Sequence, residues 1–161
     1  MIQTKENNNG GTKKIKARNN GGTTKKILIA DDHKLLRLIT KKIISETDDM
    51  VVAREVKAAG DVFDLIDNGD VDVLILQTLL SGKSGYEILR NVKEKNPMLP
   101  VLMISTYYDD IYERSAFMHG ADGFVRTDKM VDELVSAIRI VRDGKKYYNF
   151  YSEKPLQAVE H

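Results

Sequence analysis

Two adjacent carboxylates, Asp31 and Asp32, follow a short apolar run and are well suited to metal chemistry. Neighbouring side chains on a strand point to opposite faces, but where a strand ends the chain turns, and both carboxylates can then face one crevice. A hard cation such as Mg²⁺ would relieve their mutual repulsion there. The alternative is an ordinary surface pair in which Asp32 caps the following helix.

Polar residues also stand at the ends of three other apolar runs. Gln77 follows DVLIL, Ser105 ends VLMIS, and Arg126 with Thr127 follows GFV. In parallel sheets ligands bind at the carboxyl ends of the strands. These side chains and the acidic pair therefore make up the candidate site.

From Lys26 onward, short apolar runs alternate with amphipathic stretches. The apolar runs predict the strands KILIA, MVVAREV, DVLIL, VLMIS and GFV, and helical spacing predicts helices over 35–44, 62–66, 84–92, 111–117 and 128–141. Ser84 and Glu87 match the S-x-x-E pattern and predict a capping box at the start of the third helix. Asp128 is the expected cap of the last helix and Gly144 its expected stop. Strands that are each followed by a helix predict an α/β fold, a doubly wound five-stranded parallel sheet covered on both faces.

Residues 1–26 differ in composition from the rest of the 161-residue chain. They hold seven Lys or Arg and one Glu, a net charge of +6, whereas the remainder holds 18 basic and 23 acidic residues, a net charge of −5. The segment repeats NNGGTKKI as NNGGTTKKI and is nearly free of apolar residues, so we expect a disordered basic leader over 1–25. A solvated leader or a cloning remnant is favoured over a basic arm for nucleic acid or anionic membrane. The acidic remainder is a poor match for DNA.

Several function classes are disfavoured by what the sequence lacks. No apolar run approaches the roughly 20 residues of a membrane helix, and the N-terminus has no secretory apolar core. The chain has no cysteine, hence no disulfide and no thiolate metal site, and a cytoplasmic location is expected. Its histidines, His33, His119 and His161, lie far apart without ligand spacing, so no zinc site is expected, and His33 is expected to flank the acidic pair.

Residues 77–84, QTLLSGKS, match the phosphate-loop pattern GxxxxGKS except that Gln77 replaces the first glycine. That glycine begins the tight turn around the phosphate. Leu79 and Leu80 would also place bulky side chains where backbone amides must approach the phosphate oxygens. Nucleotide binding through Lys83 is therefore the weaker alternative.

Residues 26–148 resemble the receiver domain of two-component response regulators. ILIADDH resembles the family's first strand with its acidic pair, GKSGYEIL its turn into the third helix, VLMIST its fourth strand, and HGADGFV its fifth. The ending AIRIVRDGKKYYN is most like receivers that precede a LuxR-type helix-turn-helix. The resemblance implies a flavodoxin-like fold with strand order 2-1-3-4-5. It also implies a phosphorelay signalling module in transcription regulation, and not an enzyme.

Three positions match the family's phosphorylation site, and a fourth falls on its aromatic switch position. The resemblance implies that Asp31 and Asp32 correspond to the pair that holds Mg²⁺. It also implies that Ser105 is the switch hydroxyl. The aromatic switch position falls on Phe124, which could equally be an ordinary core ring.

Two other positions depart from the family's pattern: the phosphoryl-accepting Asp falls on Gln77, and the Lys that neutralises the phosphoryl oxygens falls on Thr127. An amide is no carboxylate nucleophile, so acyl-phosphate formation at residue 77 is excluded. With that carboxylate lost, the metal site is at most a weak Mg²⁺ site, and no cofactor is required. We expect a degenerate receiver, or pseudo-receiver, in which Gln77 hydrogen-bonds Ser105 or Thr127. Arg126 is expected at the surface, because adjacent strand residues face oppositely.

Tyr107, Tyr108 and Tyr112 cluster at the start of the fourth helix, beside the surface that receivers use for partner contacts. Exposed tyrosines are efficient interface anchors, although one of the three is expected to pack beneath the helix. We expect phosphorylation-independent binding of a protein partner, or self-association, through the face formed by helix 4, strand 5 and helix 5.

Residues 149–161 are expected to form a tail or the start of a linker. The aromatic residues that follow the last helix are expected to seal the edge of the domain: Tyr147, Tyr148, Phe150 and Tyr151. A truncated DNA-binding transcription regulator, whose helix-turn-helix is absent from this chain, is an open alternative. So is an atypical receiver that accepts a phosphoryl group at Thr78 or Ser81.

Overall fold

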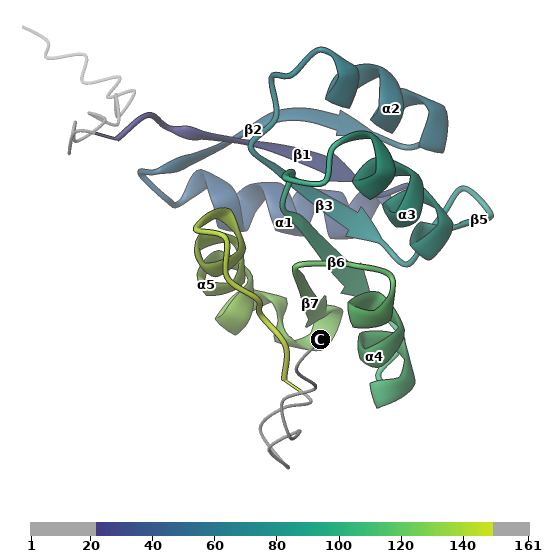
Figure 1. The fold of residues 1–161 in the computed structure, drawn as a ribbon. Coiled ribbons are helices and arrows are strands. Elements are labelled where there is room, and N and C mark those ends of the chain that lie inside the picture. Colours follow the sequence, from purple (N-terminus) through teal and green to yellow (C-terminus); the bar gives the residue numbers. More distant parts are fainter. Residues whose placement is uncertain (1–21, 150–161) are drawn as a thin grey trace, which may run out of the picture.

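The computed structural model describes residues 22–149, and their strands form one five-stranded sheet between two layers of helices (Figure 1). The strands lie in the order β2-β1-β3-β6-β7, and every neighbouring pair is parallel. Because β6 and β7 are the fourth and fifth strands of this sheet, the predicted order 2-1-3-4-5 is confirmed. The strands are β1 (Lys25–Ala30), β2 (Met50–Val56), β3 (Val73–Gln77), β6 (Val101–Ser105) and β7 (Gly123–Arg126).

Five α-helices and one 3-10 turn connect the strands. They are α1 (Lys34–Ser45), α2 (Ala59–Asp67), α3 (Gly85–Lys95), α4 (Asp110–Met118), η1 (Thr127–Lys129) and α5 (Met130–Arg142). Helices α1 and α5 cover one face of the sheet and α2, α3 and α4 the other (Figure 1), so both faces are covered, as predicted. No helix within residues 22–149 has the length and apolar character that crossing a bilayer would require.

Strand alternation divides the core between the two helical layers. On β3, Leu74 and Leu76 point into the cluster beneath α2, α3 and α4, whereas Val73 and Ile75 point into the cluster beneath α1 and α5. All five residues of β3 are buried, as expected for the central strand of a parallel sheet covered on both faces.

A small antiparallel hairpin follows β3 and was not predicted. Its strands are β4 (Leu79–Leu80) and β5 (Lys83–Ser84). The two turn residues, Ser81 and Gly82, have φ angles of 49° and 75°, the positive values typical of a tight two-residue hairpin. Strand propensity alone does not reveal so short a pair.

Two predicted helix caps are wrong in detail. Ser84 is the N-cap residue of α3, but its side chain makes no capping bond, so the predicted capping box is not formed. Asp128 does not cap α5, which begins after Lys129. Both carboxylate oxygens of Asp128 instead accept hydrogen bonds from the guanidinium of Arg126, a bidentate pair stronger than one capping bond. Asp32 is not a cap either, since His33 is the N-cap residue of α1.

Gly144 ends α5 as predicted. Its φ of 82° lies in the left-handed region that favours glycine. The N–H of Lys145 donates to the carbonyl of Ile140 at 3.2 Å, and the N–H of Gly144 donates to the carbonyl of Val141 at 3.0 Å. This pair of bonds is a Schellman motif, which turns the chain away from the helix axis.

The first two aromatic residues after α5 cover the edge of the sheet beside β7, as predicted. Tyr147 forms a parallel bridge with Gly123, and Tyr148 packs against the core. Several sequence predictions lie outside the described residues: the leader up to residue 21, the tail from residue 150 with Phe150 and Tyr151, and His161.

Candidate functional site

The register of the sheet places Gln77 beside Asp31 at its carboxyl edge. Ala30 lies opposite Leu76, so the next residues along the two strands, Asp31 and Gln77, are neighbours. The Nε2 atom of Gln77 donates a hydrogen bond to the Oδ2 atom of Asp31 over 3.3 Å, and both side chains are buried. A side-chain amide therefore occupies the centre of the candidate site.

The predicted partners of Gln77, Ser105 and Thr127, are not the observed one. Gln77 lies opposite Ile104, one residue short of Ser105. Thr78 follows Gln77, and its hydroxyl donates to the hydroxyl of Ser105 at 3.4 Å. Because of the strand register, the hydrogen-bond partner of Ser105 is Thr78 and not Gln77.

Ser105 is fully enclosed, with 0% of its surface exposed. Besides the hydroxyl of Thr78, its Oγ atom accepts a hydrogen bond from the backbone N–H of Tyr107 at 2.9 Å. This bond holds the start of the loop between β6 and α4. The switch role of Ser105 stays a prediction.

Burial dominates the electrostatics of Asp31, which is 4% exposed. Burial raises its pKa, opposed by hydrogen bonds from the backbone N–H of His33 at 2.8 Å and from Gln77, and repulsion from Asp32 raises it further. The predicted position of His33 beside the acidic pair is confirmed. An ionised carboxylate at this position is unfavourable unless it gains a stronger partner.

Arg37 supports the acidic pair and was not singled out from the sequence. Its Nη1 atom donates to the backbone carbonyl of Asp31 at 2.9 Å, and its Nε atom lies 3.4 Å from Glu55. Arg37 shares the buried stripe of α1 with Thr40 and Ile44. A cation at helical spacing on a buried stripe is the signal that could have revealed it.

Asp32 is exposed, and its partner comes from the β4–β5 hairpin. Its Oδ2 atom accepts the backbone N–H of Ser81 at 3.0 Å, and the hydroxyl of Ser81 donates to the carbonyl of Lys57. Ser81 thereby links the loops that follow β1, β2 and β3. These bonds hold a non-glycine residue at a positive φ that would otherwise be unfavourable.

The side chains of Asp31 and Asp32 are poorly arranged to bind a divalent cation. Both oxygens of Asp31 and Oδ2 of Asp32 already accept N–H groups, from Gln77, His33 and Ser81. Among residues 22–149, no three His, Cys, Asp or Glu side chains are grouped so that they could hold a metal ion. A cation would have to displace these donors and bind through the two carboxylates and water.

Thr127 and Arg126 lie at the end of β7, next to Tyr108. The hydroxyl groups of Thr127 and Tyr108 are 3.3 Å apart. The guanidinium of Arg126 stacks over the ring of Tyr108, 4.6 Å from its centroid, and pairs with Asp128. These contacts agree with the surface position predicted for Arg126.

Phe124 is 2% exposed and belongs to the core cluster beneath α2, α3 and α4. This position fits an ordinary core ring, and its switch role stays a prediction. Among the three clustered tyrosines, Tyr107 and Tyr108 are 48% and 49% exposed, whereas Tyr112 packs against the core and stacks on Tyr107 at 4.8 Å. The expectation that one of the three packs beneath the helix is confirmed.

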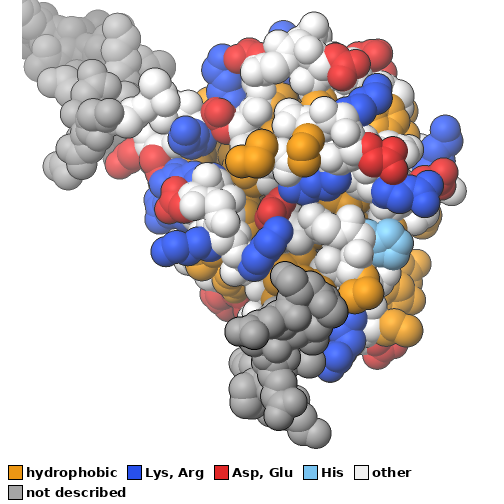
Figure 2. All heavy atoms as spheres, in the orientation of Figure 1, with side chains coloured by type: hydrophobic (Ala, Val, Ile, Leu, Met, Phe, Trp, Pro, Cys, Tyr) orange, Lys and Arg blue, Asp and Glu red, His pale blue; other side chains and the backbone are white. Residues whose placement is uncertain are grey.

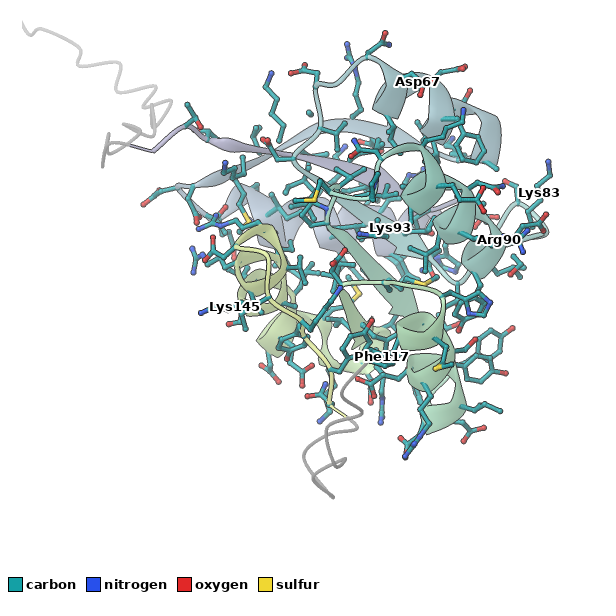
Figure 3. All side chains as sticks on the ribbon, viewed as in Figure 1. Asp67, Lys83, Arg90, Lys93, Phe117 and Lys145 are labelled. Carbon is teal, nitrogen blue, oxygen red and sulfur yellow. The ribbon has the colours of Figure 1, made fainter. Side chains whose placement is uncertain are left out.

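The GKS turn is arranged against phosphate binding. The N–H of Ser81 donates to Asp32, and the N–H of Gly85 donates to the carbonyl of Thr78 at 2.8 Å, so neither is free for an anion. Figure 3 shows Lys83 at the outer end of the hairpin, pointing away from the body of the protein. The alternative phosphoryl acceptors are also engaged: Thr78 is buried against Ser105, and the Ser81 hydroxyl donates to a carbonyl.

The sheet order, the acidic pair after β1 and the hydroxyl at the end of β6 are the features of one known family, and residues 27–139 match the model of the response regulator receiver domain. The chain belongs to the response regulator receiver family. This receiver domain is 29% identical over 121 residues to the nitrate/nitrite response regulator protein NarL of Escherichia coli (strain K12), a match that covers 74% of this chain and 55% of NarL. It is 26% identical over 121 residues to the transcriptional regulatory protein DegU of Brevibacillus brevis, covering 75% of this chain and 51% of DegU. The chain thus spans about half the length of these curated relatives.

Solved structures agree with this assignment. A LuxR family two-component response regulator from Aurantimonas sp. SI85-9A1 superposes with a TM-score of 0.73 at 25% identity, covering 78% of this chain and 89% of that one. The receiver domain of the NarL protein of Mycobacterium tuberculosis superposes with a TM-score of 0.71 at 24% identity, covering 77% of this chain and 100% of that one. The second likeness shows the fold alone.

Proposed function

We propose that this receiver domain is a pseudo-receiver that signals through protein contacts without phosphorylation at residue 77. Receiver domains are signalling domains, and we assign no catalytic residue to this chain. We place it in the cytoplasm and take residues 26–148 as the signalling unit.

The hydrogen bond from Gln77 to Asp31 carries the proposal. The nitrogen of a side-chain amide has its lone pair delocalised into the carbonyl, and it forms no acyl phosphate. The amide also donates a hydrogen bond to the carboxylate that would otherwise help to hold a metal ion. Glutamine at position 77 therefore removes the phosphoryl acceptor, and it also provides Asp31 with a hydrogen-bond donor in place of a cation.

The remaining charges at the site support the same conclusion. Thr127 stands at the end of β7 where the family's lysine is expected, and it supplies a hydroxyl in place of a cation. Arg126 is paired with Asp128 and stacked on Tyr108 at the surface. A phosphoryl group would therefore enter beside two carboxylates, Asp31 and Asp32, without a balancing cation among these residues.

The face formed by α4, β7 and α5 is the proposed partner surface. Tyr107 and Tyr108 are about half exposed there, and Ile111 and Met118 on α4 are 68% and 79% exposed. In the space-filling view, hydrophobic side chains reach the surface at the lower right, over α4 (Figure 2). Exposed aromatic and apolar groups on α4 and on the loop before it favour a protein partner or a second copy of this chain.

Intact mass after incubation with acetyl phosphate and Mg²⁺ tests the proposal. We would compare the wild type with a Gln77→Asp, Thr127→Lys double variant, which restores both lost groups. A phosphoryl adduct on the double variant alone is the expected result. An adduct on the wild type would overturn the proposal and direct attention to Thr78 and Ser81.

A second proposal concerns the whole protein. Because the chain spans about half the length of relatives named as regulators, we propose that it serves transcription regulation as part of a longer protein with a DNA-binding domain. An antibody raised against residues 26–148 should then detect, in extracts of the source cells, a protein clearly larger than the 18.2 kDa of this chain. A band at 18.2 kDa alone would contradict this second proposal.

A further inference from the structure

Residues 145–149, here called the strap, run along the free edge of β7 after α5 ends (Figure 1). Figure 3 shows the strap leaving α5 at Lys145 and passing toward Phe117 of α4. The N–H of Tyr147 donates to the carbonyl of Asp122 at 2.9 Å, and its carbonyl accepts the N–H of Phe124 at 3.0 Å. The strap therefore pairs with β7 as a minimal sixth strand and covers backbone groups that an edge strand would otherwise expose.

Alternation along the strap sends its two tyrosines to opposite faces of the sheet. Tyr147 packs against the core cluster beneath α1 and α5, and Tyr148 against the cluster beneath α2, α3 and α4. The rings of Tyr148 and Phe117 meet edge to face, with centroids 5.3 Å apart. The hydroxyl of Tyr148 donates to the carbonyl of Ala121.

Polar contacts tie the strap to the helices on both sides. Lys146 pairs with Asp122 at 2.7 Å. The backbone N–H of Asn149 donates to the Oε1 atom of Glu113 on α4 at 2.6 Å, and its side-chain nitrogen donates to the Oε2 atom of Glu133 on α5 at 3.1 Å. Asn149 thereby bridges α4 and α5 across the end of β7.

We propose that the strap is a removable cover of the β7 edge, and that it opens as a unit to uncover that edge. The strap is bonded to the sheet on one side only, so its opening breaks its own contacts but leaves the five-stranded sheet paired, and it requires less free energy than global unfolding. The uncovered edge would present unpaired N–H and C=O groups between two helices. Such an edge fits an extended peptide segment that adds as a parallel strand.

That partners use this face rests on the proposed function, whereas the opening of the strap does not. The two parts of the proposal can therefore be separated by experiment. If acetyl phosphate labels the wild type, the proposed function fails and the strap proposal stands. If the strap opens only with global unfolding, the strap proposal fails and the pseudo-receiver proposal stands.

Residue-resolved amide exchange on the full chain tests the opening. The reporter is the N–H of Phe124, which donates to Tyr147, and the reference is the N–H of Leu74, which donates to the carbonyl of Pro100 at 3.0 Å in the centre of the sheet. In the wild type we expect Phe124 to exchange at least about tenfold faster than Leu74. Equal rates at the two positions would overturn the proposal.

Two matched variants locate the effect. Tyr148→Phe removes a hydroxyl that donates to a carbonyl beneath the strap, and Tyr86→Phe removes a hydroxyl that donates to the carbonyl of Tyr112 at 3.0 Å, away from the strap. One such bond contributes about 1 kcal/mol and is broken whenever the strap opens, so Tyr148→Phe should speed exchange of Phe124 about fivefold, whereas Tyr86→Phe should leave the Phe124 rate unchanged. The same acceleration in Tyr86→Phe would overturn the proposal.

A synthetic peptide with the sequence of residues 144–151 probes the uncovered edge directly. Added in excess to the Tyr148→Phe variant, it should slow exchange of the Phe124 amide, since it can pair with β7 whenever the strap is open. A peptide with the same composition in scrambled order is the control. Equal exchange with both peptides would overturn the assignment of the β7 edge as a strand-docking surface.

Discussion

The side-chain amide of Gln77 lies 3.3 Å from the carboxylate of Asp31, on the neighbouring parallel strand. The contact follows from register, because each residue immediately follows one member of the Ala30–Leu76 pair. An aspartate at position 77 would place a second carboxylate beside Asp31 and repel it, whereas the glutamine amide forms a hydrogen bond with Asp31.

Restoring a carboxylate at this position should therefore destabilise the protein in the absence of a cation. Gln77→Asp and Gln77→Asn shorten the side chain equally and differ only in charge. In urea unfolding at pH 7 with EDTA, we expect Gln77→Asp to be less stable than Gln77→Asn by roughly 1–3 kcal/mol. Millimolar Mg²⁺ should recover most of that difference. Equal stability of the two variants without the metal ion would contradict the prediction.

Neutralising Asp31 should raise stability at neutral pH. Burial raises the pKa of Asp31 above its usual 3.8, so the folded chain binds this proton more tightly than the unfolded chain does. The contribution of Asp31 to the free energy of unfolding is therefore stabilising below pH 3.8, and it is lost as the pH rises through the folded-state pKa. Asp31→Asn should therefore raise the melting temperature at pH 7 and have a smaller effect at pH 3. Asp32→Asn is the control, because that side chain is exposed and its oxygen can still accept the N–H of Ser81.

Asp49 should stabilise the fold at neutral pH through its ion pairs with two arginines of α5. Hydrogen bonds from Arg139, and then from Arg142, lower its pKa from 3.8 to about 2 despite partial burial. Because the pKa is lowered, the stabilisation is present above pH 3.8 and is lost as the pH falls through about 2. The side chain is 35% exposed, so solvent screening limits the loss in Asp49→Asn to about 1 kcal/mol at pH 7.

Thermal unfolding at pH 7 and pH 2 checks the role of Asp49. The difference between wild type and Asp49→Asn should be present at pH 7 and shrink at pH 2. Asp143→Asn is the matched control, since its carboxylate is 67% exposed and lies 3.8 Å from Arg142. We expect that control to change stability by less than about 0.5 kcal/mol.

Gly85 should tolerate no side chain. A Cβ atom at this position would lie 2.1 Å from the backbone carbonyl oxygen of Gln77, closer than any real contact. Gly85→Ala should destabilise the fold by at least about 2 kcal/mol and shift the hairpin that holds Asp32. Gly60→Ala is the control: the space around that helical glycine is open, so the change should be neutral or stabilise by up to about 1 kcal/mol. Equal effects of the two variants in chemical denaturation would contradict the prediction.

Much of the fold could be predicted because the relevant signals are local. Apolar runs such as VLIL before Gln77 fix a strand buried on both faces, and alternation with helices leaves few arrangements other than a doubly wound sheet. The identity of residue 77 also settled one chemical question on its own. An amide forms no acyl phosphate in any conformation, so the Gln77 side chain excludes that reaction whatever its neighbours are.

Only the tertiary structure decided which groups meet. The partner of Gln77 depends on strand register, which is set by packing over the whole sheet. Because the register differs by one residue from the predicted pairing, Ser105 bonds to Thr78 and not to Gln77. The bond from Ser81 to Asp32 spans 49 residues and that from Asn149 to Glu113 spans 36. Sequence spacing carries no signal for such contacts, because they form only once the sheet and helices have brought distant segments of the chain together.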